Sequence, residues 1–250
     1  KNDWKSNVFR IAMYTDEDGY ISNKNLLNTL EEKVDLVIKQ DMYVIIDWHV
    51  LKDNNPMTYK EEAKEFFDKL SEKYKNSPNV IYEICNEPNG NVNWNNDIKP
   101  YALEIIKVIR ANSKDSVIIV GTPTWSQDIL DPVDNRIDDS NVMYALHFYA
   151  GSHKEWLRER VIKARSENIP IFVSEWGTTN ADGNGGVAMD EATAWVKFMN
   201  ENKLSYINWS LSDKDEASAI LKPGTKKNGF TDDDLSESGK FIKKVLRDEI

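Results

Sequence analysis

The sequence has 250 residues, of which 40% are hydrophobic, so it can bury the core of one large α/β barrel or of two ordinary domains. Its net charge of -10 argues against a nucleic-acid partner, because the phosphate groups would be repelled by the protein surface. Cys85 is the only cysteine, which excludes an intrachain disulfide, and no apolar stretch approaches the ~20 residues of a membrane span.

Seven short runs rich in Val, Ile and Tyr predict β-strands. The runs are apolar throughout rather than alternating, which is typical of parallel strands buried on both faces. Between them, apolar residues recur at helical spacing, and this alternation predicts βαβ units and a parallel sheet. In chain order, the predicted strands are 8–14, 43–50, 80–87, 116–122, 142–149, 170–177 and 204–211, and the predicted helices are 24–40, 58–75, 96–111, 153–166, 188–202 and 236–247.

No linker or change in composition divides the chain, so we expect a single domain over residues 1–250. A closed parallel barrel needs eight strands. An open doubly wound sheet could have seven, but its usual glycine-rich phosphate turn does not occur in the sequence. We therefore predict an α/β protein of the (β/α)8 TIM-barrel class whose first βα unit is absent from the chain. We expect an N-terminal segment of roughly 35–50 residues, or a separate chain, to supply that strand.

Polar and aromatic side chains gather at the predicted carboxyl ends of the strands, where parallel barrels place their active sites. Two of them are the carboxylates Glu87, in the stretch YEICNEPNG, and Glu175, in the stretch FVSEWGT. The others are Arg10, Tyr14, Asp47, Trp48, His49, Asn86, Trp125, His147, Tyr149, Trp176, Asn208, Trp209, Lys214 and Glu216.

Each of these residues also has a purely structural explanation when it is taken alone. Glu87 could be a solvated turn carboxylate, and His49 and His147 could be core histidines with satisfied hydrogen bonds. Arg10 is harder to explain in this way, because a cation inside an apolar strand needs an anionic partner. The combination of two Glu with Arg, His, Tyr and Trp favours sugar chemistry, since glycoside cleavage needs one protonated and one ionised carboxyl group.

Other catalytic classes find little support in the sequence. The three histidines form no HExxH motif, a second cysteine that could share a metal is absent, and no GxSxG motif is present. We interpret Cys85 as a buried structural thiol. We expect no metal and no cofactor.

With these motifs the chain resembles the glycoside hydrolase family 5 cellulases, the bacterial endo-β-1,4-glucanases. The resemblance is carried by RIAMY, YVIIDWHVL, IYEICNEPNG, YALHFYA, FVSEWGT and INWSLSDKDEASAIL, which occur in the family's order over almost the whole chain. It implies a secreted, retaining enzyme that cleaves cellulose-type β-glucans. Related barrels cleave mannan, xylan, lichenan or xyloglucan with the same two Glu, and an inactive glycan-binding fragment is a further alternative.

The resemblance also implies roles in the reaction. Glu87 would be the acid/base and Glu175 the nucleophile. Arg10 would hydrogen-bond near the nucleophile and keep it ionised, and Asn86 would contact the 2-hydroxyl of the sugar. The family's first strand, with a further substrate-binding His and an aromatic residue after it, has no match in this sequence.

The resemblance assigns the remaining residues to the sugar chain. Trp209 would be the stacking platform beside the cleavage point, and Trp125 would stack a more distant ring on the leaving-group side. The residues that would hold the sugar, bind glucosyl hydroxyls or orient the carboxylates are His49, His147, Tyr149, Lys214 and Glu216.

Overall fold

The computed structural model of the protein describes residues 1–226 and 228–250. Two compact units can be distinguished, and each is described by itself. The larger unit comprises Asn7–Leu146 and Lys163–Phe172, and the smaller unit comprises Lys1–Ser6, His147–Ile162 and Val173–Ile250.

The described residues form seven strands, which follow one another in chain order in one sheet. The predicted alternation of strands and helices is confirmed, with ends that differ by a few residues. The strands are β1 (Val8–Tyr14), β2 (Tyr43–His49), β3 (Val80–Glu83), β4 (Ile118–Val120), β5 (Val142–Tyr149), β6 (Ile171–Gly177) and β7 (Ser205–Asn208). The helices are α1 (Leu26–Lys39), α2 (Lys60–Lys73), α3 (Lys99–Asn112), α4 (Pro123–Ser126), α5 (Glu155–Ser166), α6 (Met189–Glu201) and α7 (Glu237–Leu246), with short turns η1 (Trp94–Ile98), η2 (Val133–Asn135) and η3 (Asp232–Asp234).

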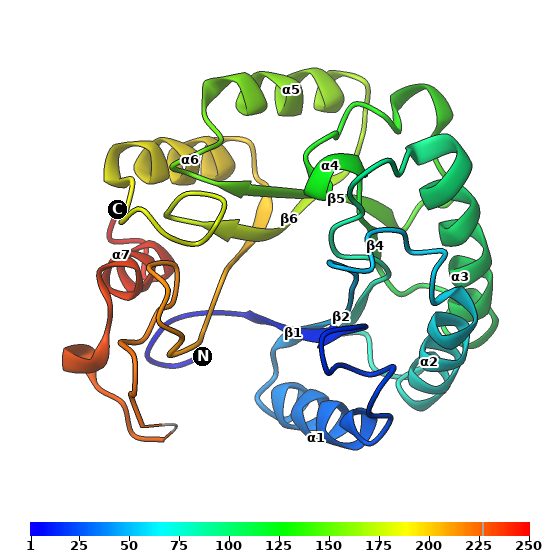
Figure 1. Cartoon of the computed structure of the whole chain (residues 1–250), viewed down its shortest axis with the longest axis horizontal. Helices are drawn as coiled ribbons and strands as arrows, with labels where there is room; N and C mark the ends of the chain where they lie inside the picture. Colours follow the sequence, from blue (N-terminus) through cyan, green and yellow to red (C-terminus); the bar gives the residue numbers. More distant parts are fainter. Residues whose placement is uncertain (227) are drawn as a thin grey trace. The chain divides into compact units, whose positions relative to one another are not determined.

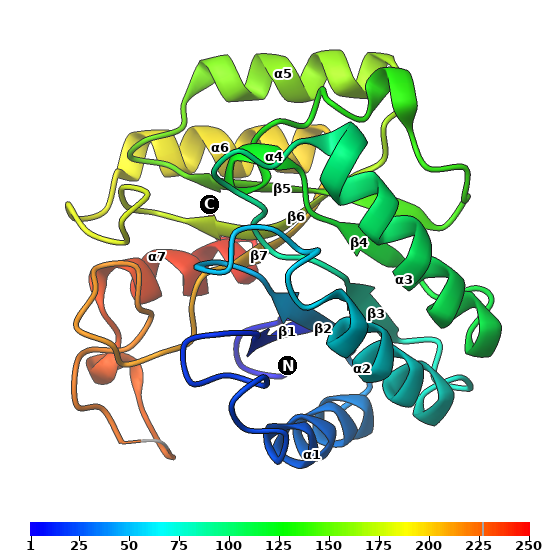
Figure 2. The same ribbon diagram turned by 45° about the vertical axis from the view of Figure 1, so that its right-hand side comes forward.

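In the larger unit, strands β1 to β5 pair in parallel. Helices α1, α2 and α3 lie along the same side of these strands (Figures 1 and 2). Helix α2 buries Phe66, Phe67 and Leu70 at helical spacing. The ring centroid of Trp48 on β2 lies 4.9 Å from that of Phe66, so this face of the sheet is apolar core.

The pleat of the strands sends alternate side chains to the opposite face. Asp47 therefore points away from the helices that cover Trp48. In the register of the sheet, Asp47 lies opposite Ala12 on β1 and opposite Glu83 on β3. The two carboxyl groups consequently stand side by side on neighbouring strands.

The smaller unit repeats this division between an apolar and a polar face. On β5, Phe148 stacks on Trp195 of α6 with ring centroids 3.8 Å apart, and it also stacks on Trp176 of β6 at 5.5 Å. His147 and Glu175 precede these aromatic residues in the chain and so point to the other face.

No helix among residues 1–226 and 228–250 is both long and apolar enough to cross a bilayer.

Candidate active site

Glu87 lies in a loop, not at the end of a strand as predicted. Strand β3 ends at Glu83, and residues 84–90 continue without strand structure. The backbone N–H of Asn86 donates to the carbonyl of Trp48, and the next N–H, of Glu87, donates to the carbonyl of Val50, both at 3.1 Å. Successive N–H groups of a regular strand point to opposite sides, so two bonds to the same neighbour end the strand.

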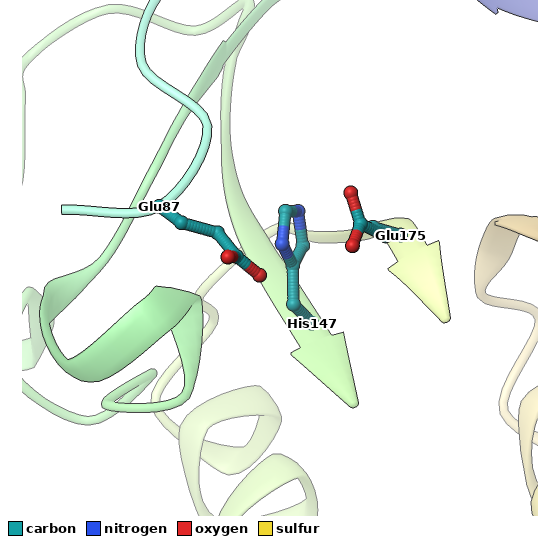
Figure 3. A group of neighbouring side chains, drawn as sticks. All are labelled: Glu87, His147 and Glu175. Carbon is teal, nitrogen blue, oxygen red and sulfur yellow. The ribbon is translucent and has the colours of Figure 1, made fainter. Parts of the chain in front are cut away.

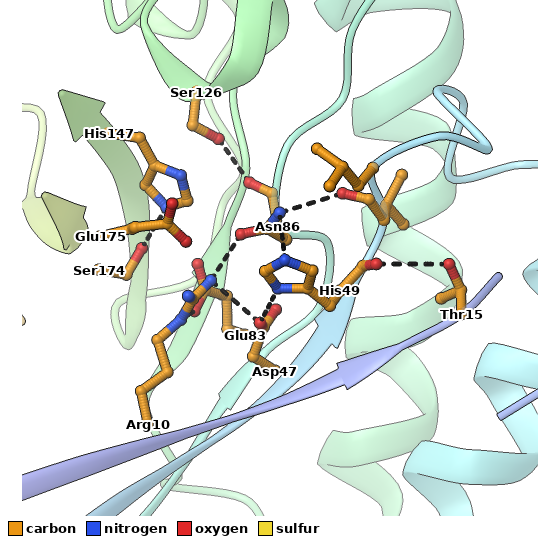
Figure 4. A network of polar contacts seen from close by, with 12 residues as sticks. Arg10, Thr15, Asp47, His49, Glu83, Asn86, Ser126, His147, Ser174 and Glu175 are labelled. Atoms are coloured by element: carbon orange, nitrogen blue, oxygen red, sulfur yellow. Dashed lines mark hydrogen bonds and ion pairs between the residues drawn. The ribbon is translucent and has the colours of Figure 1, made fainter. Parts of the chain in front are cut away.

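A buried ion cluster lies below this loop (Figure 4). The Arg10 side chain is only 4% exposed. Its Nε donates to Glu83 Oε2 at 2.6 Å, and its Nη2 lies 3.0 Å from Asp47 Oδ2. Nη2 also donates to the side-chain oxygen of Asn86 at 2.6 Å. The prediction that Arg10 needs an anionic partner is confirmed, and the partners are Glu83 and Asp47.

The same cluster orients His49. Its Nδ1 lies 2.6 Å from Asp47 Oδ2, and its Nε2 lies 3.4 Å from the Asn86 side-chain nitrogen. Because the Asn86 side-chain nitrogen can only donate, Nε2 accepts from it, and Nδ1 carries the proton that faces Asp47. The Asn86 nitrogen also donates to the Val50 carbonyl at 3.1 Å, so both ends of this amide are fixed.

In this cluster one guanidinium binds two carboxylates. Burial raises the pKa of Asp47, whereas the Arg10 guanidinium and the His49 ring act in the opposite direction. Asp47, His49 and Glu83 are groups that could ligate a metal. The guanidinium that already binds both carboxylates would repel a second cation, so this cluster does not fit a metal site.

In the smaller unit, the candidate nucleophile accepts a hydrogen bond from a neighbouring strand. The Tyr149 hydroxyl donates to Glu175 Oε1 at 2.8 Å, and Glu175 is 5% exposed. A Cβ at Gly177 would lie 2.3 Å from the Tyr149 ring, so the glycine leaves room for that ring beside β6. His147 Nε2 lies 3.0 Å from Ser174 Oγ. Figure 3 shows His147 on β5, Glu175 on β6 and Glu87 on its loop.

Three candidate sugar-binding residues of the smaller unit follow β7. The Trp209 N–H donates to the Trp176 carbonyl at 2.7 Å, and Lys214 Nζ lies 5.6 Å from the centre of the Trp209 ring. The Ser218 hydroxyl donates to Glu216 Oε1. Trp209, Lys214 and Glu216 thus belong to one segment of chain, as predicted.

Not every tryptophan at a strand end serves a site. Trp125, in the turn after β4, is 45% exposed and can receive a ligand. Trp48 and Trp176 are fully buried and pack in the aromatic core, so the expectation that they line the rim is wrong. The burial of both tryptophans could have been predicted from the sequence. Each directly follows a polar residue, and successive side chains of a strand point to opposite faces.

The larger unit thus gathers Arg10, His49 and Asn86 in one hydrogen-bonded network, and the smaller unit joins Tyr149 to Glu175. Sequence reasoning missed Glu83 as a member of the network. Glu83 could have been found from the sequence, because it is a carboxylate inside an apolar strand and so needs a buried cation. Arg10 lies two strands away and, inside an apolar strand of its own, needs a buried anion.

Comparison with known proteins identifies the family. Residues 1–215 match the model of cellulase, glycosyl hydrolase family 5. Endoglucanase 5 of Pectobacterium carotovorum is 54% identical over 99% of this chain and 49% of its own length. Endoglucanase A of Evansella cellulosilytica is also 54% identical, over 99% of this chain and 51% of its own length. The chain therefore spans about half the length of these curated relatives.

Solved structures agree with this match. A structure from Cytophaga hutchinsonii has a TM-score of 0.96 and 40% identity, covering 99% of this chain and 81% of that one. The catalytic domain of a Thermobifida fusca endoglucanase, in complex with cellotetraose, has a TM-score of 0.94 and 36% identity, covering 98% of this chain and 83% of that one. The predicted TIM-barrel fold class is confirmed, and the chain belongs to glycosyl hydrolase family 5.

Proposed function

We propose that the chain hydrolyses internal β-1,4-glucosidic bonds of cellulose-type β-glucans with retention of configuration. The observation that carries the proposal is the 54% identity, over nearly the whole chain, to proteins named endoglucanase. The cellotetraose complex of a structural relative supports the choice of a glucan. A polymeric substrate would place the enzyme outside the cell.

In this proposal Glu87 gives its proton to the glycosidic oxygen while Glu175 attacks the anomeric carbon. The leaving sugar departs, and Glu87 then takes a proton from the water that hydrolyses the glycosyl-enzyme. The hydrogen bond from Tyr149 to Glu175 Oε1 favours the ionised form of the nucleophile. Arg10 would add to this stabilisation, and Asn86, held by Arg10 and Val50, would present its amide to the sugar 2-hydroxyl.

The other candidate residues would bind the glucan. Trp209 and Trp125 would stack sugar rings on the two sides of the scissile bond. The groups that would hydrogen-bond sugar hydroxyls or orient the carboxylates are His49, His147, Lys214 and Glu216.

The first test is the stereochemical course and the separation of the carboxyl groups. Proton NMR should show the β-anomer first, and a crystal structure should place the Glu87 and Glu175 carboxyl groups about 5–5.5 Å apart, the spacing of retaining enzymes. Glu87→Gln should lower turnover of cello-oligosaccharides by about 10²–10⁴-fold, the usual contribution of a positioned acid or base. The inverted anomer as first product would refute the mechanism.

The second test is substrate preference. We expect carboxymethyl cellulose and lichenan to be cleaved in preference to mannan and xylan. A clear preference for mannan would mean that the enzyme is a mannanase that uses the same two-carboxylate mechanism. Binding of cellotetraose without turnover by the unsubstituted chain would indicate a glycan-binding protein instead.

A further inference from the structure

The turn after β4 has an unusual backbone. Thr124, Trp125 and Ser126 all have positive φ values, of 57°, 54° and 58°. L side chains rarely adopt this left-handed conformation, and runs of three such residues persist only when their surroundings hold them in place. Two of the hydrogen bonds of this turn are made to the loop that carries Glu87.

The first contact is made by a buried hydroxyl. Ser126 is fully buried, and its Oγ donates to the Asn86 carbonyl at 2.7 Å while accepting from the Thr122 N–H at 3.2 Å. This bond joins the turn to the residue immediately before Glu87, as Figure 4 shows.

The second contact is made by the backbone of the exposed tryptophan. The Trp125 N–H donates to the Pro88 carbonyl at 3.0 Å, on the other side of Glu87. Gly121 allows this approach, since a Cβ there would lie 2.3 Å from the Cys85 carbonyl oxygen and 2.8 Å from Pro88 Cδ. The carbonyl groups of Asn86 and Pro88, the residues before and after Glu87, are thus bonded to one turn.

We propose that Ser126 is a positioning residue for the acid/base, and that the left-handed turn couples the Trp125 platform to the proton donor Glu87. Because β3 ends at Glu83, Glu87 depends on contacts with other segments: its own N–H bonds to the Val50 carbonyl, and the turn bonds to the residues before and after it. The same three residues expose the Trp125 ring and hold the Glu87 backbone. The inference rests on the proposed function of Glu87.

Aryl β-cellobiosides that differ only in the acidity of the phenol test this role. Phenyl β-cellobioside needs protonation of its leaving group, whereas dinitrophenyl β-cellobioside does not. A misplaced acid should therefore slow only the first, and kcat/KM isolates the bond-breaking step in a retaining mechanism. We expect Ser126→Ala to lower kcat/KM for the phenyl compound by about 10–100-fold, the scale of a 1 Å misplacement, and to change that for the dinitrophenyl compound by less than about threefold.

Ser126→Gly separates the hydroxyl from the backbone conformation. Glycine adopts positive φ freely, so this variant relieves strain but still lacks the Oγ. It should show the same selective loss as Ser126→Ala. Normal activity of Ser126→Gly on phenyl β-cellobioside would overturn the proposal, as would equal losses on both substrates in either variant.

Ser71→Ala is the matched control for loss of a buried serine. Ser71 lies on α2, is fully buried, and likewise donates to a carbonyl and accepts one hydrogen bond. It should leave the ratio of the two kcat/KM values unchanged. Glu87→Gln is the reference for complete loss of the acid. If Glu87→Gln shows no selectivity, or the unsubstituted chain cleaves neither substrate, the proposed function fails. If Glu87→Gln is selective and the Ser126 variants are not, only the positioning role fails.

Discussion

The Arg10 cluster and the Glu216 loop hold their carboxylates in different ways. Asp47 and Glu83 stand on neighbouring strands and are fully buried, and both bind the Arg10 guanidinium. Glu216 lies on a loop, half-buried, and accepts a hydrogen bond from Ser218. A buried, charged side chain on a strand cannot move without loss of stability. A carboxylate on a loop can be moved by a small substitution in that loop while the fold stays intact. The two regions should therefore respond differently to substitution.

The largest effect should come from Arg10→Met. It leaves Asp47 and Glu83 buried without their cation, which costs about 3–5 kcal/mol of unfolding free energy when one partner of a buried pair is removed. Urea denaturation followed by circular dichroism measures this loss. Lys52→Met removes the cation of a pair with Glu17 whose lysine side chain is 72% exposed, and should change stability little. Equal stability of Arg10→Met and the unsubstituted protein would show that the cluster is not held by its charges.

Gly183→Ala should shift the loop carboxylate while leaving the fold intact. Gly183 has φ +81°, and an added Cβ would lie 2.5 Å from Glu216 Oε1. In the proposed function Glu216 accepts a hydrogen bond from a sugar hydroxyl, so displacing it should raise KM for cello-oligosaccharides about tenfold, with kcat nearly unchanged.

The control for this substitution is in the same loop. Gly186→Ala imposes the same backbone strain, because φ is +75° there, but its Cβ would meet nothing within 4 Å. It should cost similar stability without the change in KM. If both alanine variants raise KM alike, loop strain and not the Glu216 contact is responsible.

Asp139→Asn should have the smallest effect, and one that depends on pH. Arg110 Nε donates to Asp139 Oδ2 at 2.7 Å, and these hydrogen bonds lower the pKa of Asp139. A carboxyl group with a lowered folded-state pKa stabilises the protein above its unfolded-state pKa, and this contribution is lost as pH falls through the folded-state value. Solvent screening limits the contribution to at most about 1 kcal/mol.

Urea denaturation between pH 6 and about pH 3 measures that dependence. The difference in stability between the unsubstituted protein and Asp139→Asn should shrink as pH falls below about 4. A difference that stays constant with pH would mean that the Arg110 pair contributes through packing alone.

The fold was predictable because apolar runs and helical spacing are local signals. The ends of β3 and β4 were not, since they depend on tertiary contacts. Strand β3 ends early because the N–H groups of Asn86 and Glu87 both bond to the same neighbour, at Trp48 of β2 and at Val50 just after it. Pro123, which has no N–H, follows β4 closely.

The site was predictable to a similar degree. Residue types at strand ends singled out Arg10, His49 and Glu175 as candidates, and the resemblance supplied the roles that are proposed for them. Glu83 was missed because its function depends on its register opposite Asp47, which the sequence of a single strand does not reveal. Ser126 was missed because its importance comes from a hydrogen bond to a backbone carbonyl, and any residue type offers such a carbonyl.

The burial of the tryptophans also divides them into two optical classes. Trp48 and Trp176 are shielded from water and from dissolved quenchers, so their fluorescence reports on the integrity of the apolar core. Trp125 and also Trp156 of helix α5 are open to solvent, so their emission lies at longer wavelength and responds to whatever covers the rings. The buried tryptophans therefore probe unfolding, and in a Trp156→Phe background Trp125 probes occupancy of the turn after β4.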